Sequence, residues 1–113
     1  MPTIRSRQDF ARIGANGRTR ADRLMVVRFV PNARDHDRFG ISTSRRLGSA
    51  VQRNRVRRRI RSVLRAERPQ NTSGLDLLIV ARPESVEATF EELRSALERL
   101  LQAARGASVR DGK

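Results

Sequence analysis

Closely spaced arginines are the residues of this sequence whose type and spacing best suit a chemical role. Seven of them occur in the 13 residues from Arg53 to Arg65, and no acidic residue lies between Arg38 and Ala66. A guanidinium presents a planar fork to phosphate oxygens and a flat face to nucleobases. Because an ordinary solvated helix face mixes acids with bases, this acid-free segment predicts a surface that binds phosphates.

Groups suited to catalysis are sparse. The only histidine, His36, lies between Asp35 and Asp37 in an expected turn, where a solvated residue is the simplest interpretation. Asp76 is isolated in its segment and the other acids are scattered, so no paired carboxylates for acid–base catalysis or a two-metal clamp are evident. The sequence also lacks a Gly-rich phosphate loop and any cysteine. We therefore expect no catalytic residue and no bound metal in this chain.

The overall charge points to a polyanionic partner. Among 113 residues, 25 are basic and 12 are acidic, which gives a net charge of +13, and the segment 38–66 contains ten arginines. Such a chain repels itself unless a polyanion neutralises it, so we expect a nucleic acid or, as a second choice, an anionic membrane surface. There is no signal peptide or membrane-spanning run, and with the lack of cysteine this predicts a soluble, cytoplasmic protein.

The hydrophobic patterns predict the elements that position these arginines. They indicate a single α+β domain of order α-β-β-α-β-α, a sandwich of helices on a small mixed sheet. The helices are expected at 6–15, 50–66 and 90–105, and the strands at 24–30, 39–44 and 75–81, the first two strands running antiparallel. Gly106 is expected to end the last helix, so that residues 1–105 form the domain and 106–113 a flexible tail.

The arginine-rich helix has two distinct faces at 100° per residue. Its apolar residues fall within one arc that is expected to face the core: Val56, Ile60, Val63 and Leu64. The other faces carry Asn54, Arg55, Arg57, Arg58, Arg59, Arg61 and Arg65, while Arg53 lies in the first turn and Arg45 and Arg46 extend the patch before the helix. Cations near a helix N-terminus are unfavourable until phosphates dock there, which again favours a polyanion.

The arginine patch by itself suits several nucleic-acid-binding proteins. A ribosomal or RNA-chaperone protein would share it, and so would a DNA-packaging protein. The sequence lacks the cysteines of zinc fingers, the heptads of a zipper and a convincing helix-turn-helix. Its four phenylalanines, with no Tyr or Trp, are too few for the aromatic platform of an RNA-recognition motif. Phe10, Phe29 and Phe39 are candidates for stacking on bases, although packing in the core is the favoured interpretation of each.

The string SRRLGSAVQRNRVRRR at 44–59 resembles the signature of the bacterial ribonuclease P protein subunits. That signature has a Ser, two basic residues, an apolar residue and Gly, followed by a small residue, Ala-Val, Arg-Asn-Arg and a basic run. Further likenesses occur at 8–10 (QDF), 39–42 (FGIS) and 89–92 (TFEE), so the resemblance covers about 6–104.

The resemblance implies a fold in which a helix crosses between two parallel strands in the rare left-handed sense. It also implies a role as the protein subunit of ribonuclease P. In that enzyme a large RNA, assisted by Mg²⁺, hydrolyses precursor tRNA and releases the 5′ leader, while the protein supplies no catalytic residue. The expected partners are therefore the catalytic RNA, in a 1:1 complex, and precursor tRNA.

Two binding surfaces are carried over by the resemblance. The first contacts the catalytic RNA and comprises Arg45, Arg46, Arg53, Asn54, Arg55, Arg57, Arg58, Arg59 and Arg61. The second is a cleft between the first helix and the sheet, which holds the single-stranded leader and includes Phe10. Members of the family often have a second aromatic one turn after Phe10, where this chain has Gly14. We therefore expect Ile13 and Arg28 to share in binding the leader.

Overall fold

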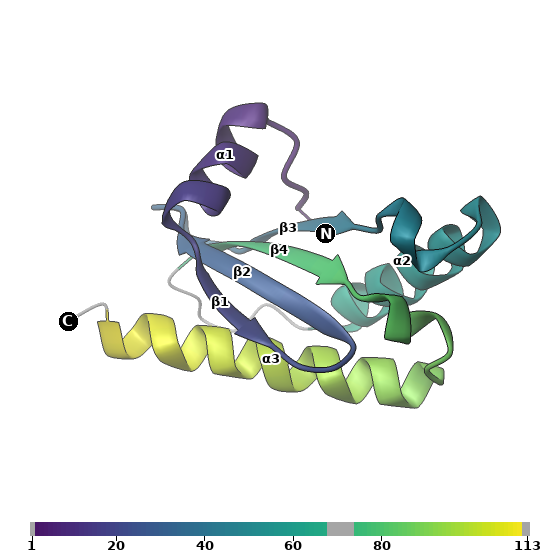
Figure 1. Cartoon of the computed structure of the whole chain (residues 1–113). Helices are drawn as coiled ribbons and strands as arrows, with labels where there is room; N and C mark the ends of the chain where they lie inside the picture. The colour runs from purple at the N-terminus through teal and green to yellow at the C-terminus, as the bar shows by residue number, and fades with distance from the viewer. Residues whose placement is uncertain (1, 68–73, 112–113) are drawn as a thin grey trace.

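The structure, a computed structural model, describes residues 2–67 and 74–111 as a four-stranded sheet with helices on both faces (Figure 1). Its helices are α1 (Arg7–Asn16), α2 (Ala50–Ala66) and α3 (Phe90–Asp111). Its strands are β1 (Arg18–Ala21), β2 (Met25–Pro31), β3 (Arg38–Ser42) and β4 (Leu75–Ala81), and short 3-10 turns η1 (Arg45–Leu47) and η2 (Pro83–Val86) precede α2 and α3. Within these two ranges, no helix combines the length and apolar character needed to cross a membrane.

The sheet is mixed, as predicted, and its strands follow the order β1-β2-β4-β3. β4 pairs antiparallel with β2 and parallel with β3. The strands predicted at 24–30 and 39–44, which are β2 and β3, therefore do run antiparallel, but β4 separates them. β4 is the most apolar of the strands, and helices lie on either side of the sheet that contains it. Its side chains are buried except for Leu78 and Val80, which are half-buried on the outer face. The segment β3–α2–β4 is a crossover between parallel neighbours, whose left-handed sense stays a prediction.

β1 is an element that the sequence pattern does not predict. Its residues, RTRA, show no apolar alternation, and all but Arg20 are exposed. The strand forms because it pairs antiparallel with β2, from Arg18 opposite Phe29 to Ala21 opposite Val26. This tertiary pairing outweighs the weak strand propensity of the segment. The element order is consequently α-β-β-β-α-β-α.

Most of the core lies between the sheet and the helices α2 and α3, while α1 covers the opposite, outer face (Figure 1). The buried side chains of α2 are those that its periodicity predicts: Val56, Ile60, Val63 and Leu64. The cluster beneath α1 is much smaller and consists of Ile4, Ile13 and Val30, with Leu78 packed against it. α2 is therefore firmly anchored on its apolar side, which leaves its other faces free.

α3 is longer than the sequence predicts. Gly106 lies inside the helix, which continues to Asp111, so the prediction that Gly106 ends it is wrong. Ala104 and Ala107 are buried on either side of Gly106. Their packing outweighs the roughly 1 kcal/mol that a glycine costs inside a helix relative to alanine. Of the predicted tail 106–113, residues 112–113 lie outside the described residues.

Candidate nucleic-acid interface

The sequence immediately before α2 fixes where this helix begins. The hydroxyl of Ser49 accepts a hydrogen bond from the backbone N–H of Gln52 at 3.2 Å, and the Gln52 side chain accepts one from the Ser49 N–H at 2.9 Å. This reciprocal capping box satisfies donors that a helix end leaves free. Gly48 has a φ of 128°, and a Cβ there would lie 2.0 Å from Oε1 of Gln52. The start of α2, and with it the direction of every arginine that follows, is thus set locally.

The structure brings the predicted catalytic-RNA residues together on α2 and on the turn before it. Val56 and Ile60 are 1% and 0% exposed, so the residues between them turn outward. The exposed residues are Arg45, Arg46, Asn54, Arg55 and Arg58, and the half-buried ones are Arg53, Arg57, Arg59 and Arg61. We refer to these nine residues as the arginine surface.

Neutral acceptors orient several side chains of the arginine surface. Arg57 donates to Oγ1 of Thr43 at 2.5 Å. Arg55 and Arg59 reach across to the segment before α3 and donate to backbone carbonyls at 3.3 and 3.2 Å. The ion pairs formed among the described residues are made by His36 and by arginines outside this surface. Neutral groups therefore hold these guanidiniums in place, and no acidic side chain in the described part of the chain neutralises their charge, which suits binding to a polyanion.

The second predicted surface lies where α1 crosses the outer face of the sheet. The hydroxyl of Ser6 caps α1 by accepting from the N–H of Gln8 at 3.1 Å. Phe10, in the following turn, is 38% exposed. A Cβ at Gly40 of β3 would lie 3.0 Å from the Phe10 ring and 3.4 Å from the side chain of Leu78. The missing side chain at Gly40 therefore makes room for the ring.

The other two residues predicted for this cleft differ in their accessibility. Ile13 is fully buried beside Ile4, so its side chain offers no surface to RNA, and this corrects the prediction that it binds the leader. Arg28 is half-buried on the outer face, and its Nη2 donates to the carbonyl of Gly14 at 3.2 Å. It thereby binds the negative end of the α1 dipole. A contact between Arg28 and the leader stays a prediction.

The four phenylalanines divide into two buried and two accessible ones. Phe29 and Phe39 are 1% and 7% exposed, which confirms that they pack in the core. Phe10 is 38% exposed, so the core interpretation does not hold for it, and Phe90, at the start of α3, is 36% exposed. Phe10 is therefore the one candidate stacking residue of the sequence whose ring is accessible.

A hollow that the sequence does not predict lies at the C-terminal end of β4. It is lined by Val80, Arg82 and Arg46, together with neighbours from η2 and from the residue before η1. Val80 is two residues from Leu78 on the same strand and therefore shares its outer face. The hollow thus extends the face that carries Phe10 towards the arginine surface. A lone arginine after a strand gives no signal in the sequence, and only the fold places Arg82 beside Arg46.

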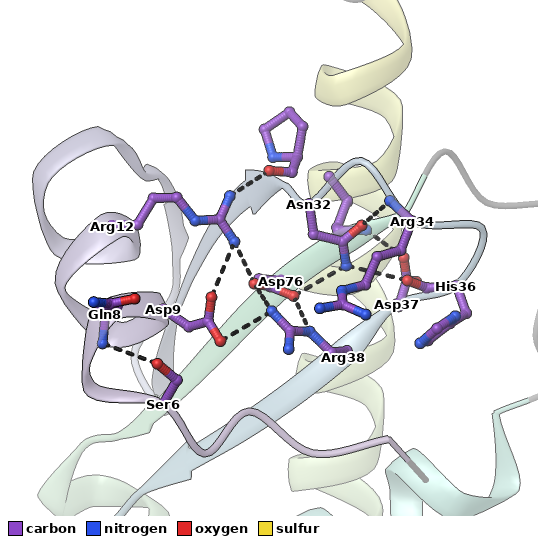
Figure 2. A network of polar contacts seen from close by, with 12 residues as sticks. Ser6, Gln8, Asp9, Arg12, Asn32, Arg34, His36, Asp37, Arg38 and Asp76 are labelled. Atoms are coloured by element: carbon purple, nitrogen blue, oxygen red, sulfur yellow. Dashed lines mark hydrogen bonds and ion pairs between the residues drawn. The ribbon is translucent and has the colours of Figure 1, made fainter.

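A buried aspartate that the sequence presents as isolated joins α1 to the sheet (Figure 2). Asp76 of β4 is 0% exposed and accepts hydrogen bonds from Arg38 at 2.8 and 2.6 Å, from Asn32 at 3.0 Å and from Arg12 of α1 at 2.5 Å. Burial alone would raise the pKa of Asp76, but these hydrogen bonds and the charges of Arg38 and Arg12 outweigh it and hold the pKa below its usual value. The hydrogen bond to Asp76 in turn raises the pKa of Arg38. These side chains therefore form a network that stabilises the carboxyl group of Asp76 in its ionised form.

Together, the fold and the arginine surface define a class of protein: a small α+β protein with an exposed, strongly basic crossover helix. Comparison with known proteins gives the family. The family model described as ribonuclease P matches residues 2–105. The chain therefore belongs to the bacterial protein components of ribonuclease P, which implies a part in processing the 5′ end of tRNA.

Relatives and solved structures agree with this assignment. The ribonuclease P protein component of Chloroflexus aggregans is 43% identical over 102 residues, which are 89% of this chain and 76% of that protein. The component of Caldanaerobacter subterraneus is 35% identical over 99 residues, which are 88% of this chain and 85% of that protein. The RNase P protein of Staphylococcus aureus superposes with a TM-score of 0.83 at 33% identity, over 93% of this chain and 96% of the other. The RNase P protein of Thermotoga maritima superposes with a TM-score of 0.79 at 27% identity, over 91% of this chain and 97% of the other.

Proposed function

We propose that this protein binds the catalytic RNA of ribonuclease P through its arginine surface and the 5′ leader of precursor tRNA through the cleft beside α1. The observation that carries the first part is a helix with one fully apolar, buried side and outer faces whose arginines have no acidic partner among the described residues. Seven arginines within 13 residues are mutually repulsive in the free protein. Phosphates docked on them would relieve that repulsion.

The proposed leader site depends on the outer face of the sheet. Beside α1 this face offers the exposed Phe10 ring and the half-buried apolar side chains of Leu78 and Val80. Aromatic stacking is a sequence-tolerant way to bind unpaired bases. At the far end, Arg46 and Arg82 could contact phosphates as the strand passes towards the arginine surface. Ile13 is left out of this site because it is buried.

In this proposal the chemistry belongs to the RNA subunit. Precursor tRNA is hydrolysed by the RNA with Mg²⁺, and this chain contributes binding, in a 1:1 cytoplasmic complex. Within the described residues, no three or more His, Asp or Glu side chains gather in a way that could hold a metal ion. The proposal assigns the Mg²⁺ to the RNA and no catalytic residue to this chain.

Reconstitution tests both surfaces. The RNA subunit is assayed with and without the protein, at limiting Mg²⁺, on precursor tRNA with a leader of several nucleotides and on tRNA without one. We expect the protein to increase cleavage at low Mg²⁺ and to improve binding of the substrate that carries a leader. Cleavage by the protein without RNA, or no effect of the protein on the RNA, would contradict the proposal.

A pair of phenylalanine variants tests the leader site. Phe10→Ala should reduce the preference for substrates with a leader, whereas Phe90→Ala, which removes an equally exposed ring from another helix, should leave that preference unchanged. The partner itself is checked by sequencing the RNA that co-purifies with the tagged protein. Ribosomal RNA as the stoichiometric partner, or tighter binding of duplex DNA than of structured RNA at matched salt, would favour the alternative functions.

A further inference from the structure

α1 has little apolar contact with the rest of the protein. Ile13 is its only buried residue, and the cluster around it is completed by Ile4 and Val30. α2 and α3, in contrast, share an extended core on the other face of the sheet. The position of α1 must therefore depend on polar contacts to a greater extent than the position of either other helix.

Arg28 of β2 contributes hydrogen bonds to the carbonyls of the last turn of α1. The polar contacts made by side chains of α1 itself come from two residues that lie one turn apart (Figure 2). Arg12 donates to Oδ2 of Asp76 at 2.5 Å and to the carbonyl of Pro31 at 2.6 Å. Asp9 forms an ion pair with Arg38 at 3.2 Å. Arg38 also makes two hydrogen bonds to the buried carboxylate of Asp76. The Asp76–Arg38 pair is thus a fixed point within the sheet, and Arg12 ties α1 both to that point and to the end of β2.

This tie lies next to the ring of Phe10. Asp76 is paired with Arg38 across β4 and β3, and Leu78 is paired with Gly40 one step further along the same strands. Side chains two residues apart on a strand point to the same face and lie about 7 Å apart. The Phe10 ring covers the position of Gly40. The contact of Arg12 with Asp76 therefore lies next to the Phe10 ring. The two occupy neighbouring cross-strand pairs on the same face of the sheet.

We propose that Arg12 is a positioning residue for the precursor tRNA leader: by tying α1 to Asp76 and Pro31, it holds Phe10 at the height above the sheet at which an unpaired base can stack. The inference rests on the proposed leader cleft and assigns Arg12 an action through Phe10. When Arg12 is removed, Asp76 keeps its two hydrogen bonds from Arg38, so the sheet retains a paired charge. The polar ties of α1 that remain are the Asp9–Arg38 ion pair and the hydrogen bonds from Arg28 to the last turn of the helix. With the tie to Asp76 and Pro31 gone, α1 can shift relative to the sheet, while the arginine surface on α2 is unaffected.

The experiment uses the full-length protein assembled with the RNA subunit and compares Arg12→Gln with Arg7→Gln. Arg7 is an exposed arginine in the first turn of the same helix, so its replacement removes the same charge without breaking a contact to Asp76. Three quantities are measured: hydrogen–deuterium exchange of the α1 amides, affinity for the RNA subunit, and the ratio of affinities for precursor tRNA with and without a leader. Arg12→Lys serves as the conservative variant.

We expect Arg12→Gln to raise exchange in α1 alone, to leave affinity for the RNA subunit unchanged, and to lower the leader-dependent ratio several-fold. Arg7→Gln should keep the ratio of the wild type, and Arg12→Lys should restore it in part, because a single ammonium replaces a fork that reaches two partners. An unchanged ratio in Arg12→Gln, or equal losses in Arg7→Gln and Arg12→Gln, would overturn the proposal. If wild-type protein shows no leader dependence, the leader cleft itself is refuted, and α1 exchange in Arg12→Gln still decides whether Arg12 positions the helix.

Discussion

Replacing Arg58 by alanine should weaken binding to the RNA subunit by an amount that depends on salt. Arg58 is exposed in the middle of α2, between the buried Val56 and Ile60, and forms no hydrogen bond or ion pair with the described residues. Its removal therefore breaks no contact within the fold. Substitutions of this kind change the free energy of unfolding by less than about 0.5 kcal/mol, so a change in binding can be read directly.

The size of the effect follows from counterion release. Each phosphate that a cation neutralises steepens the log–log dependence of affinity on salt by about 0.7 to 0.9. If Arg58 contacts one phosphate, Arg58→Ala should make this slope shallower by about the same amount. A fourfold rise in salt, from about 50 to about 200 mM, should then shrink the difference in affinity between wild type and variant by about threefold.

The assay is a titration of the RNA subunit with protein at several salt concentrations, with two control variants. Arg58→Lys keeps the charge and should keep the wild-type slope. Arg94→Ala removes a charge from α3, where Arg94 pairs with Glu91 and Glu98, and should also leave the slope unchanged. A wild-type slope in Arg58→Ala would place Arg58 outside the interface. An equal change in Arg94→Ala would show that net charge, and not the arginine surface, governs binding.

Three further substitutions test the core, the buried network and the cleft. Leu97→Ala, at a fully buried position of α3, should lower the free energy of unfolding in urea by about 2–5 kcal/mol. Asp76→Asn leaves Arg38 without its buried anionic partner and should cost about 3–5 kcal/mol at neutral pH. The pKa of Asp76 in the folded protein lies below the unfolded value near 3.8. Its contribution to the free energy of unfolding is therefore complete above that pH and is lost as the pH falls through the folded pKa. Urea titrations in acid should accordingly show a smaller loss of stability in Asp76→Asn than in wild type. Gly40→Val, whose Cβ would lie 3.0 Å from the Phe10 ring, should displace the ring and lower the leader-dependent affinity ratio, with affinity for the RNA subunit unchanged.

The sequence by itself determined α2 and its chemistry. The capping box of Ser49 and Gln52 and the spacing of the apolar residues from Val56 to Leu64 are local signals, and a helix is built from local hydrogen bonds. Once the apolar side is fixed, the period of 3.6 residues assigns a direction to every arginine. The directions of the seven residues of the arginine surface that lie on α2 could therefore be predicted from the chain alone.

Only the tertiary structure decided what depends on contacts between distant segments. β1 exists because β2 offers it a partner, α3 continues past Gly106 because Ala107 packs in the core, and Ile13 is withdrawn from the cleft because α1 presses it against the sheet. Asp76 acquires its arginine partners from residues 38 and 64 positions away in the sequence. No local pattern encodes such pairs, because burial, ion pairing and strand order are set by which surfaces meet when the chain folds.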